Sequence, residues 1–539
     1  MSRRKNMKPS YYITTPIYYV NDRPHIGHAY TSLACDVLAR FKRLDGYDVM
    51  FLTGTDEHGL KVAQSAAKQD MEPQEFTDKY SQTFRDLTKS LNLSNDDFIR
   101  TTEQRHIEAC QVLWNKLVEK GDIYLGKYEG WYAVRDEAYY GEDELKAGPN
   151  GKKIAPSGAE CEWMEEPSYF FRLSAWGDKL LEFYDKHQDF ILPTSRRNEV
   201  ISFVKAGLKD LSVSRTTFDW GIPVPNDPKH VMYVWMDALT NYITGVGYPD
   251  TTSESYQKRW PADVHIVGKD ILRFHTVYWP AFLMAADLEP PKRVFAHGWW
   301  TNNGQKISKS LGNTINPLDL IRTYGLDQTR FYMLRNVTFG SDGDFSRKTM
   351  IDCINGNLAN DFGNLAQRSL SMINKNCDGK VPVPADFTEA DRALLDKAAV
   401  LPNVVRKEFD EQAFHKALDA IWEIVGECNK YADEQAPWSL SKSDTQRMNT
   451  VLYVLGETIR HVAVVTQPFM PDSMDKLLDQ LAVPKEQRLI QHLSPEFALK
   501  PGTDLPAPTA VFPRYIEGGK GAKVPQKKAG ANGKPFNLG

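Results

Sequence analysis

The sequence predicts an α/β protein of several domains, in which a parallel-sheet domain is split by an insertion and followed by a helical bundle. Three observations support this fold class. The 539 residues exceed what one hydrophobic core accommodates, so two to four domains are expected. A strand, a helix and a second strand follow one another near the start of the chain. After about residue 350 the pattern changes to long amphipathic helices with little glycine.

A βαβ unit opens the chain. Residues 11–15 are rich in β-branched and aromatic side chains, which is typical of a buried strand. A helix is indicated by apolar residues at helical spacing, namely Ile26, Tyr30, Leu33, Val37, Phe41 and Leu44. Residues 49–53 form a second strand pattern, which ends in Gly54-Thr55-Asp56-Glu57-His58-Gly59. Strands joined by a helix lie parallel, and ligands bind at the carboxyl ends of such strands.

The α/β pattern is interrupted by an aromatic and acidic stretch with repeated glycines, which we interpret as an inserted domain. The pattern resumes near residue 231, and further strands are expected at 265–268 and 294–298. Five lysines among Gly, Ala and Pro at the end of the chain predict a disordered basic tail. The expected units are 1–118 (first half of the sheet domain), 119–225 (insertion), 226–300 (second half), 301–354 (loop and linking region), 355–515 (helical bundle) and 516–539 (tail).

Composition excludes several classes of protein. The composition is 41% hydrophobic and 25% charged, which is ordinary for a globular protein. A formal net charge of -4 excludes a uniformly basic nucleic-acid coat but leaves room for a local basic face. No apolar run is long enough to cross a membrane, and the basic start lacks the apolar segment of a signal peptide. Six cysteines without a Cys-x-x-Cys pair favour a reducing compartment, so a cytoplasmic location is expected.

The first motif is Pro24-His25-Ile26-Gly27-His28 at the start of the predicted helix. A helix N-terminus offers unpaired N–H groups to an anion, and His25 and His28 lie on one face with their donors directed at the same phosphate. Gly27 has no side chain, so adenine could approach the backbone closely. Taken alone, the string is equally compatible with a pair of surface histidines.

The second motif is Lys306-Ile307-Ser308-Lys309-Ser310, which follows the last predicted strand of the sheet domain. Lysines bind phosphate as point charges, and this loop could close on a polyphosphate and stabilise charge as pyrophosphate leaves. Taken alone, the motif is equally compatible with a solvated basic loop. The order and placement of the two motifs together favour an ATP site.

The two motifs resemble the signatures of class I aminoacyl-tRNA synthetases, which activate an amino acid as its adenylate. The resemblance extends from Tyr12 to about Tyr515 and is closest to the methionyl-tRNA synthetases. The segments that carry it are Thr15-Pro16-Ile17-Tyr18-Tyr19-Val20-Asn21, Gly54-Thr55-Asp56-Glu57-His58-Gly59, Val234-Trp235-Met236-Asp237-Ala238, Gly268-Lys269-Asp270-Ile271, His297-Gly298-Trp299 and Asp433-Glu434-Gln435-Ala436-Pro437-Trp438. The resemblance implies a Rossmann-like catalytic domain split by a connective domain, with a helical anticodon-binding domain behind it.

The same resemblance implies the reaction and its residues. L-methionine and ATP would give methionyl-adenylate and pyrophosphate, and methionine would then pass to the 3'-terminal ribose of tRNA(Met). Charge stabilisation would come from His25, His28, Lys306 and Lys309, with Mg²⁺ held mostly by phosphate oxygens. ATP binding is expected at Gly27, Lys269, Asp270, Ser308 and Ser310, with Asp270 on the ribose hydroxyls. Methionine binding is expected at Ile17, Tyr19, Asp56, Trp235, Ala238, Leu239, Tyr242, Ile271 and His275.

Apolar and aromatic walls suit a polarizable thioether, and Asp56 suits the substrate ammonium. Without the resemblance, Trp235, Tyr242 and Ile271 are more often core residues, and Asp56 or Asp270 could be helix caps. Anticodon reading is expected at Asn364, Arg368 and Trp438, because unstacked bases are recognised by stacking and by hydrogen bonds to their edges. A buried bundle tryptophan is the alternative for Trp438.

The sequence departs from the family pattern in two places. Many members carry a zinc knuckle in the insertion, whereas residues 119–225 hold only Cys161, so no structural zinc is expected. The inserted domain must then be held by aromatics such as Trp131, Tyr132, Tyr139, Tyr140 and Trp163. The chain ends in a short basic tail where some relatives add a dimerising domain, so a monomer is expected. A small-molecule nucleotidyltransferase and a silent tRNA-binding paralogue are the competing hypotheses.

Overall fold

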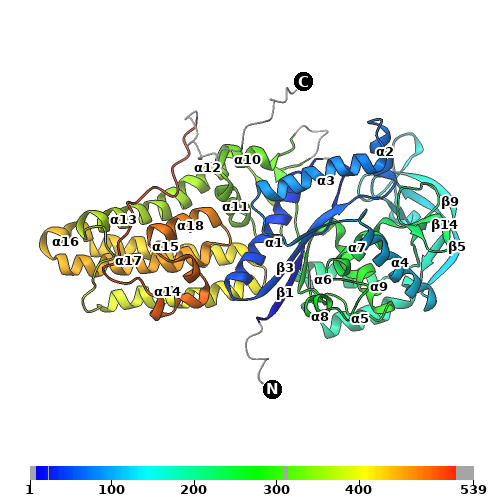
Figure 1. Cartoon of the computed structure of the whole chain (residues 1–539). Coiled ribbons are helices and arrows are strands. Elements are labelled where there is room, and N and C mark those ends of the chain that lie inside the picture. The colour runs from blue at the N-terminus through cyan, green and yellow to red at the C-terminus, as the bar shows by residue number, and fades with distance from the viewer. Residues whose placement is uncertain (1–7, 22, 308–312, 518–539) are drawn as a thin grey trace, which may run out of the picture.

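A seven-stranded parallel sheet organises the first half of the chain (Figure 1). The structure is a computed structural model that describes residues 8–21, 23–307 and 313–517. The sheet runs β10-β16-β15-β1-β3-β2, and β4 also pairs with β3. Its strands are β1 (Ser10–Thr14), β2 (Tyr18–Tyr19), β3 (Asp48–Asp56), β4 (Asp97–Arg100), β10 (Ile191–Leu192), β15 (Val264–Gly268) and β16 (Val294–His297). Thr14 at the end of β1 pairs with Leu52 on one side and His265 on the other, so the carboxyl ends of the central strands lie together.

Alternate residues of the central strands enter two separate hydrophobic cores. Ile13 and Phe51 belong to the core that includes α1 (Ile26–Leu44) and the helical domain, whereas Tyr12 and Leu52 belong to the core on the opposite face. This two-residue period is what a doubly covered sheet requires. The remaining helices of this half are α2 (Leu60–Ala67), α3 (Pro73–Ser90), α4 (Gln104–Glu119), α5 (Gly177–Lys186), α6 (Thr194–Lys205), α7 (Val234–Thr244), α8 (Glu254–Arg259) and α9 (Trp279–Ala285).

The insertion forms an antiparallel sheet at one end of the molecule (Figure 1). Its path is β6-β5-β9-β8-β7, and β11 also pairs with β9. Aromatic pairs span it, with Trp131 on Trp163 and Tyr132 on Tyr139 at centroid distances of 5.4 and 4.7 Å. Its strands are β5 (Ile123–Ala133), β6 (Ala138–Tyr140), β7 (Lys146–Ala147), β8 (Lys153–Ile154), β9 (Glu160–Phe171) and β11 (Leu211–Ser212).

One predicted boundary needs correction. Residues 119–225 were expected to form an insertion outside the nucleotide-type sheet, but β10 lies within this range and pairs in parallel with β16 of the main sheet. A strand of two residues has no periodicity from which it could be recognised. Further short pairs complete the region, namely β12 (Ser214–Arg215), β13 (Pro223–Val224) and β14 (Asp227–Met232). The chain therefore enters the main sheet briefly before the second half begins.

A small sheet and a helical bundle follow. The sheet is formed by β17 (Trp300–Asn302), β18 (Gln305–Lys306) and β19 (Gly343–Phe345). The helices are α10 (Pro317–Tyr324), α11 (Leu326–Arg335), α12 (Arg347–Cys353), α13 (Asn364–Asn376), α14 (Glu389–Asp410), α15 (Phe414–Gln435), α16 (Pro437–Ser443), α17 (Thr445–Thr466) and α18 (Pro471–Gln480). π-Helical segments lie at Phe274–Tyr278 and Ile354–Gly363. Short 3₁₀ turns lie at Glu142–Glu144, Pro149–Gly151, Leu173–Trp176, Lys269–Ile271, Lys485–Gln487, Ile490–Leu493 and Pro495–Phe497. Residues 518–539 of the predicted tail lie outside the described residues.

A buried ion pair joins the sheet domain to the helices. Arg330 of α11 donates to Asp36 of α1 at 2.7 Å, and both side chains are fully buried. The same guanidinium donates to the carbonyls of Leu91, Pro468 and Phe469. Burial opposes ionisation of Asp36, but Arg330, Arg40 and the hydrogen bonds from Ser94 together outweigh it and lower the pKa of that carboxyl. Such a pair fixes the relative orientation of the elements that it connects. Within the described part of the chain, no helix is both long and apolar enough to span a bilayer.

Candidate active site

The two histidines of the first motif cap helix α1. His25 is the N-cap residue, and its Nδ1 accepts a hydrogen bond from the Gly27 N–H at 3.1 Å. His28 Nδ1 accepts from the His25 N–H at 3.0 Å. The two rings are tilted by 35° to each other, with centroids 3.8 Å apart. Because both Nδ1 atoms accept, each neutral ring carries its proton on Nε2 and can donate to a ligand from that atom.

These imidazoles are neutral at pH 7. Burial lowers the pKa of His25 below its ordinary value, and burial together with the neighbouring ring lowers the pKa of His28 further. They therefore offer N–H donors rather than the positive field that the sequence suggests. Gly27 serves the same arrangement, since a Cβ there would lie 3.0 Å from the His25 ring. The expectation that Gly27 admits adenine is not tested by this contact.

Lys269 and Asp270 follow β15, and both contact the side chain of Trp299. Asp270 accepts from Trp299 Nε1 at 3.1 Å and is exposed. Lys269 donates to Asp342 at 2.7 Å and lies 4.2 Å from the Trp299 ring centroid. Trp299 thus orders both predicted ATP-binding side chains, a contact that sequence reasoning missed. Its presence in a matching segment was the available signal.

The predicted methionine residues gather on α7 and on the segment after β15. Tyr242 OH lies 2.6 Å from His275 Nε2, and His275 Nδ1 lies 2.9 Å from the carbonyl of Ile271. His275 Nδ1–H donates to that carbonyl, so its Nε2 accepts from the tyrosine. Burial lowers the pKa of His275 to about 4, which keeps the ring neutral. Tyr242 and His275 are each 1% exposed, so the pair is fixed in a dry environment.

Trp235 is half-buried and stacks on Phe274 at a centroid distance of 3.7 Å. Phe274 was missed by sequence reasoning, although it follows a matching segment. Ala238 and Leu239 are buried on α7, and Ile17, Tyr19 and Ile271 are partly buried against the same core. The structure thus places the predicted methionine-binding residues around one aromatic and apolar region at the carboxyl ends of the strands.

Asp56 ends β3 beside this region and is 7% exposed. Its Oδ1 is buried and has no hydrogen-bond partner among the described residues. Burial and the neighbouring carboxylates of Asp237, Glu137 and Glu57 raise the pKa of Asp56 well above its ordinary value. A buried carboxyl oxygen without a partner is costly, and a cationic ligand would relieve that cost.

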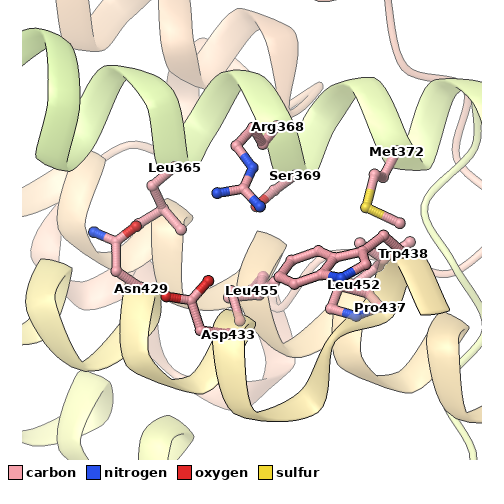
Figure 2. Close-up of a pocket in the computed structure, with 11 residues that line it drawn as sticks. Leu365, Arg368, Ser369, Met372, Asn429, Asp433, Pro437, Trp438, Leu452 and Leu455 are labelled. Atoms are coloured by element: carbon pink, nitrogen blue, oxygen red, sulfur yellow. The ribbon is translucent and has the colours of Figure 1, made fainter. Parts of the chain in front are cut away.

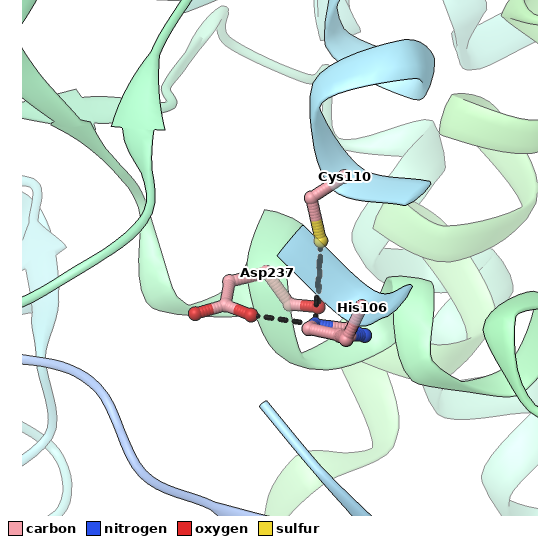
Figure 3. A group of neighbouring side chains, drawn as sticks. All are labelled: His106, Cys110 and Asp237. Carbon is pink, nitrogen blue, oxygen red and sulfur yellow. Dashed lines mark hydrogen bonds and ion pairs between the residues drawn. The ribbon is translucent and has the colours of Figure 1, made fainter. Parts of the chain in front are cut away.

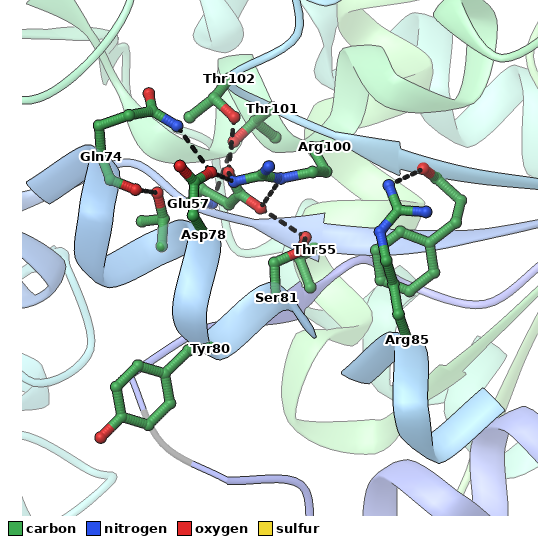
Figure 4. Close-up of polar contacts among 12 residues, drawn as sticks. Thr55, Glu57, Gln74, Asp78, Tyr80, Ser81, Arg85, Arg100, Thr101 and Thr102 are labelled. Carbon is green, nitrogen blue, oxygen red and sulfur yellow. Dashed lines mark hydrogen bonds and ion pairs between the residues drawn. The ribbon is translucent and has the colours of Figure 1, made fainter. Parts of the chain in front are cut away.

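The next residue, Glu57, anchors the end of β3 (Figure 4). Arg100 donates to both of its carboxylate oxygens, at 2.7 and 2.9 Å, and also to Asp78 at 2.6 Å. Thr55 and Thr102 donate to the same carboxylate. Bidentate guanidinium pairing fixes orientation, so this network holds the strand end that presents Asp56.

Asp237 lies behind the site, between two histidines. His58 Nδ1 and His106 Nε2 lie 2.6 and 2.8 Å from its two oxygens, and Cys110 Sγ lies 3.3 Å from His106 (Figure 3). Burial opposes ionisation, but the histidines outweigh it and lower the pKa of Asp237. Burial and Asp237 raise the pKa of the Cys110 thiol, which disfavours the thiolate that a metal needs. We interpret this group as a hydrogen-bonded support for α7.

The second motif is only partly described. β18 ends at Lys306, whose side chain lies outside the described part, as do Ser308, Lys309 and Ser310. Their predicted roles remain expectations.

The helical domain contains a pocket between α13, α15, α16 and α17 (Figure 2). Arg368 of α13 and Trp438 of α16 face each other across it, with the guanidinium 5.0 Å from the ring centroid. Trp438 is 41% exposed, so it is not the buried bundle residue of the alternative reading. Asn364 is exposed one turn before Arg368 and does not line the pocket. The walls of the pocket are completed by Leu365, Ser369, Met372, Asn429, Ala432, Asp433, Pro437, Leu452 and Leu455.

The chain has a split parallel sheet, a histidine-capped helix after β2, a lysine motif after the last strand of that sheet, and a helical domain. This is the arrangement expected of a class I aminoacyl-tRNA synthetase. Residues 11–370 match the family described as "tRNA synthetases class I (M)", and residues 381–532 match "Anticodon binding domain of methionyl tRNA ligase". The chain therefore belongs to the methionyl-tRNA synthetase family.

Individual relatives agree with this assignment. The methionine–tRNA ligase of Brucella suis biovar 1 is 58% identical, over 96% of this chain and 99% of its own length. That of Rickettsia bellii is 59% identical, over 95% and 100%. The structure of Mycobacterium tuberculosis methionyl-tRNA synthetase in complex with methionyl-adenylate matches with a TM-score of 0.92 and 53% identity, over 94% of this chain and 100% of that one.

Proposed function

We propose that this chain activates L-methionine with ATP to methionyl-adenylate and pyrophosphate, and then transfers methionine to the 3'-terminal ribose of tRNA(Met). Family membership supports the reaction class. The observation that carries the substrate assignment is the unpartnered, buried Asp56 Oδ1 beside an aromatic region. An α-ammonium would pair with Asp56 while a flexible thioether side chain contacts the aromatic walls.

In the first step the methionine carboxylate attacks the α-phosphorus of ATP in line, and pyrophosphate leaves. The reaction needs positioning and charge stabilisation rather than a protein nucleophile. His25 and His28 donate Nε2–H to phosphate oxygens, next to the positive end of α1. Asp270 accepts from the ribose hydroxyls, and Lys269 lies beside it. Gly27, Ser308 and Ser310 complete the ATP contacts, while Lys306 and Lys309 neutralise the departing pyrophosphate.

The neutral state of the two histidines affects how much positive charge Mg²⁺ must supply. Because the pKa of His25 and of His28 lies below its ordinary value, most of the positive charge is expected from the lysine loop and from Mg²⁺. Mg²⁺ is usually held by substrate phosphates and water, so it requires no protein cage. When bound it neutralises charge on the phosphate oxygens.

The methionine site is formed by three groups of residues. Tyr242 and His275 form a fixed polar pair at its base, in which the tyrosine O–H is donated to His275 Nε2 and the tyrosine ring can contact the thioether. Trp235 and Tyr19 supply the aromatic walls. The apolar lining is completed by Ile17, Ala238, Leu239 and Ile271. Size and shape, rather than a charged contact, would then reject branched side chains.

Transfer to tRNA uses the helical domain as a separate reader. The terminal ribose hydroxyl attacks the adenylate carbonyl, and AMP leaves. Trp438 stacks on an anticodon base, Arg368 contacts its edge, and Asn364 contacts a neighbouring one. The exposed ring and the facing guanidinium support these roles.

The same proposal includes a monomeric, cytoplasmic enzyme without structural zinc. A structural zinc site needs four ligands, whereas residues 119–225 contain one cysteine, Cys161, whose thiol pKa is raised by burial.

The test is methionine-dependent exchange of pyrophosphate into ATP, followed by charging of tRNA(Met). Both activities are expected from the purified chain, and chelation of zinc should leave both unchanged. Charging without any dependence on methionine, or tRNA binding without charging, would refute the proposal.

A further inference from the structure

One acidic residue of the inserted domain contacts Tyr19, a residue of the proposed methionine site. Glu137 lies in the turn between β5 and β6, has a φ of 47° and is 5% exposed. A positive φ is unusual for a residue other than glycine, aspartate or asparagine and persists only where surrounding contacts hold it. Those contacts come from the catalytic half of the chain, more than seventy residues away along the sequence.

Glu137 contacts the catalytic half at Tyr19, at Lys61 and at Gly59. Tyr19 OH donates to Glu137 Oε1, and the Lys61 N–H donates to the same oxygen at 3.1 Å. Helix α2 starts after Gly59, which has no side chain to cap it, so Glu137 provides the cap from another domain. A Cβ on Gly59 would lie 2.5 Å from both Glu137 oxygens, so the glycine leaves the space that the carboxylate fills.

These contacts join the insertion to the strand end that carries Asp56. Tyr19 pairs directly with Asp56 in the β2–β3 register, and Gly59 is three residues beyond it. The tyrosine hydroxyl is thus fixed by the insertion, while its side chain packs against the core that contains Leu239 and Tyr242. Lys61 Nζ lies 5.7 Å from the same ring.

We propose that Glu137 is a positioning residue for methionine, which fixes Tyr19 against the substrate and adds negative potential beside the α-ammonium. This inference rests on the proposed function, because it assumes that Tyr19 lines the methionine site. It assigns to the insertion a direct part in amino-acid binding.

The charges around Glu137 give the proposal a pH signature. Burial raises the pKa of Glu137 to about 7, against hydrogen bonds from Tyr19 and the Lys61 N–H and the charges of Lys61 and Arg215. The Glu137 charge in turn raises the pKa of Asp56, so protonation of one member of this carboxyl pair is favoured. Because the ionised form attracts an ammonium, kcat/KM for methionine should fall as pH drops through about 7.

The experiment measures pyrophosphate exchange by the full chain with Glu137→Ala, Glu137→Gln and Tyr19→Phe. Glu137→Ala should raise KM for methionine about 10-fold, with kcat within about twofold and KM for ATP unchanged, the split expected for lost substrate binding. Glu137→Gln keeps an acceptor for Tyr19 and Lys61, so its KM should change less, but the inflection near pH 7 should disappear. Tyr19→Phe combined with Glu137→Ala should add little to either change alone.

Glu162→Ala is the matched control, because this exposed residue lies on β9 of the same inserted sheet. It should leave every parameter unchanged. An unaltered KM for methionine in Glu137→Ala, or an inflection retained in Glu137→Gln, would overturn the inference. A lower kcat together with an equal rise in KM for methionine and in KM for ATP would also overturn the inference, because it would indicate general disruption of the enzyme. If Glu137→Ala fails to fold, the results for Glu137→Gln and Tyr19→Phe decide whether the inference holds. Failure of the proposed function is distinct, since the unmodified chain would then show no methionine-dependent exchange.

Discussion

Truncating Trp438 should separate tRNA recognition from amino-acid activation. Trp438→Ala removes a half-exposed ring and the surface that Arg368 faces at 5.0 Å, leaving the bundle core intact. Stacking of one base on an aromatic side chain contributes about 1–3 kcal/mol. Each 1.4 kcal/mol is a factor of ten, so kcat/KM for tRNA charging should fall about 5- to 150-fold.

The assay compares charging with methionine-dependent pyrophosphate exchange on the same preparation. Exchange should remain within about twofold, because the pocket belongs to the helical domain and not to the strand ends. Val404→Ala is the control, since this α14 side chain is also 41% exposed and does not line the pocket. Equal losses of charging and exchange would refute the separate-reader reasoning.

Three further predictions concern the catalytic half. His25→Asn retains a good N-cap but loses the ring donor, so the melting temperature should hold while the activation rate falls about 100-fold; an unchanged rate would exclude donation by His25. Asp56→Asn should raise KM for methionine about 10- to 100-fold in exchange assays, because a charge-assisted hydrogen bond is lost; a raised KM for ATP instead would contradict this role. Arg330→Met leaves Asp36 buried without this partner, so urea titration should give a free energy of unfolding lower by about 3–5 kcal/mol. A decrease of less than about 1 kcal/mol would contradict this, because Arg40 alone would then compensate the charge of Asp36.

Local patterns predicted much of the fold, because they report on single elements. The apolar spacing from Ile26 to Leu44 predicted α1, which the structure confirms. The ligand site expected at the end of β3 stays a prediction. The family was confirmed by full-length relatives. The short β10 was not predicted, since two residues carry no period, and the insertion boundary was wrong for that reason.

The site was less accessible from sequence where contacts are distant or depend on ring orientation. The spacing of His25 and His28 indicated a shared face, but not that both Nδ1 atoms accept from the helix backbone and leave the rings neutral. Glu137 gave no signal, because its partner Tyr19 is 118 residues away and belongs to another domain. Trp299 and Phe274 were missed because their partners are set by packing between segments.

Pyrophosphate exchange across methionine, leucine, isoleucine and valine tests the central claim most directly. Saturable exchange is expected with methionine, with at least about 10-fold lower kcat/KM for each of the other three, because the proposed apolar methionine site would discriminate by shape. No exchange at saturating methionine, or equal exchange with a branched amino acid, would contradict it.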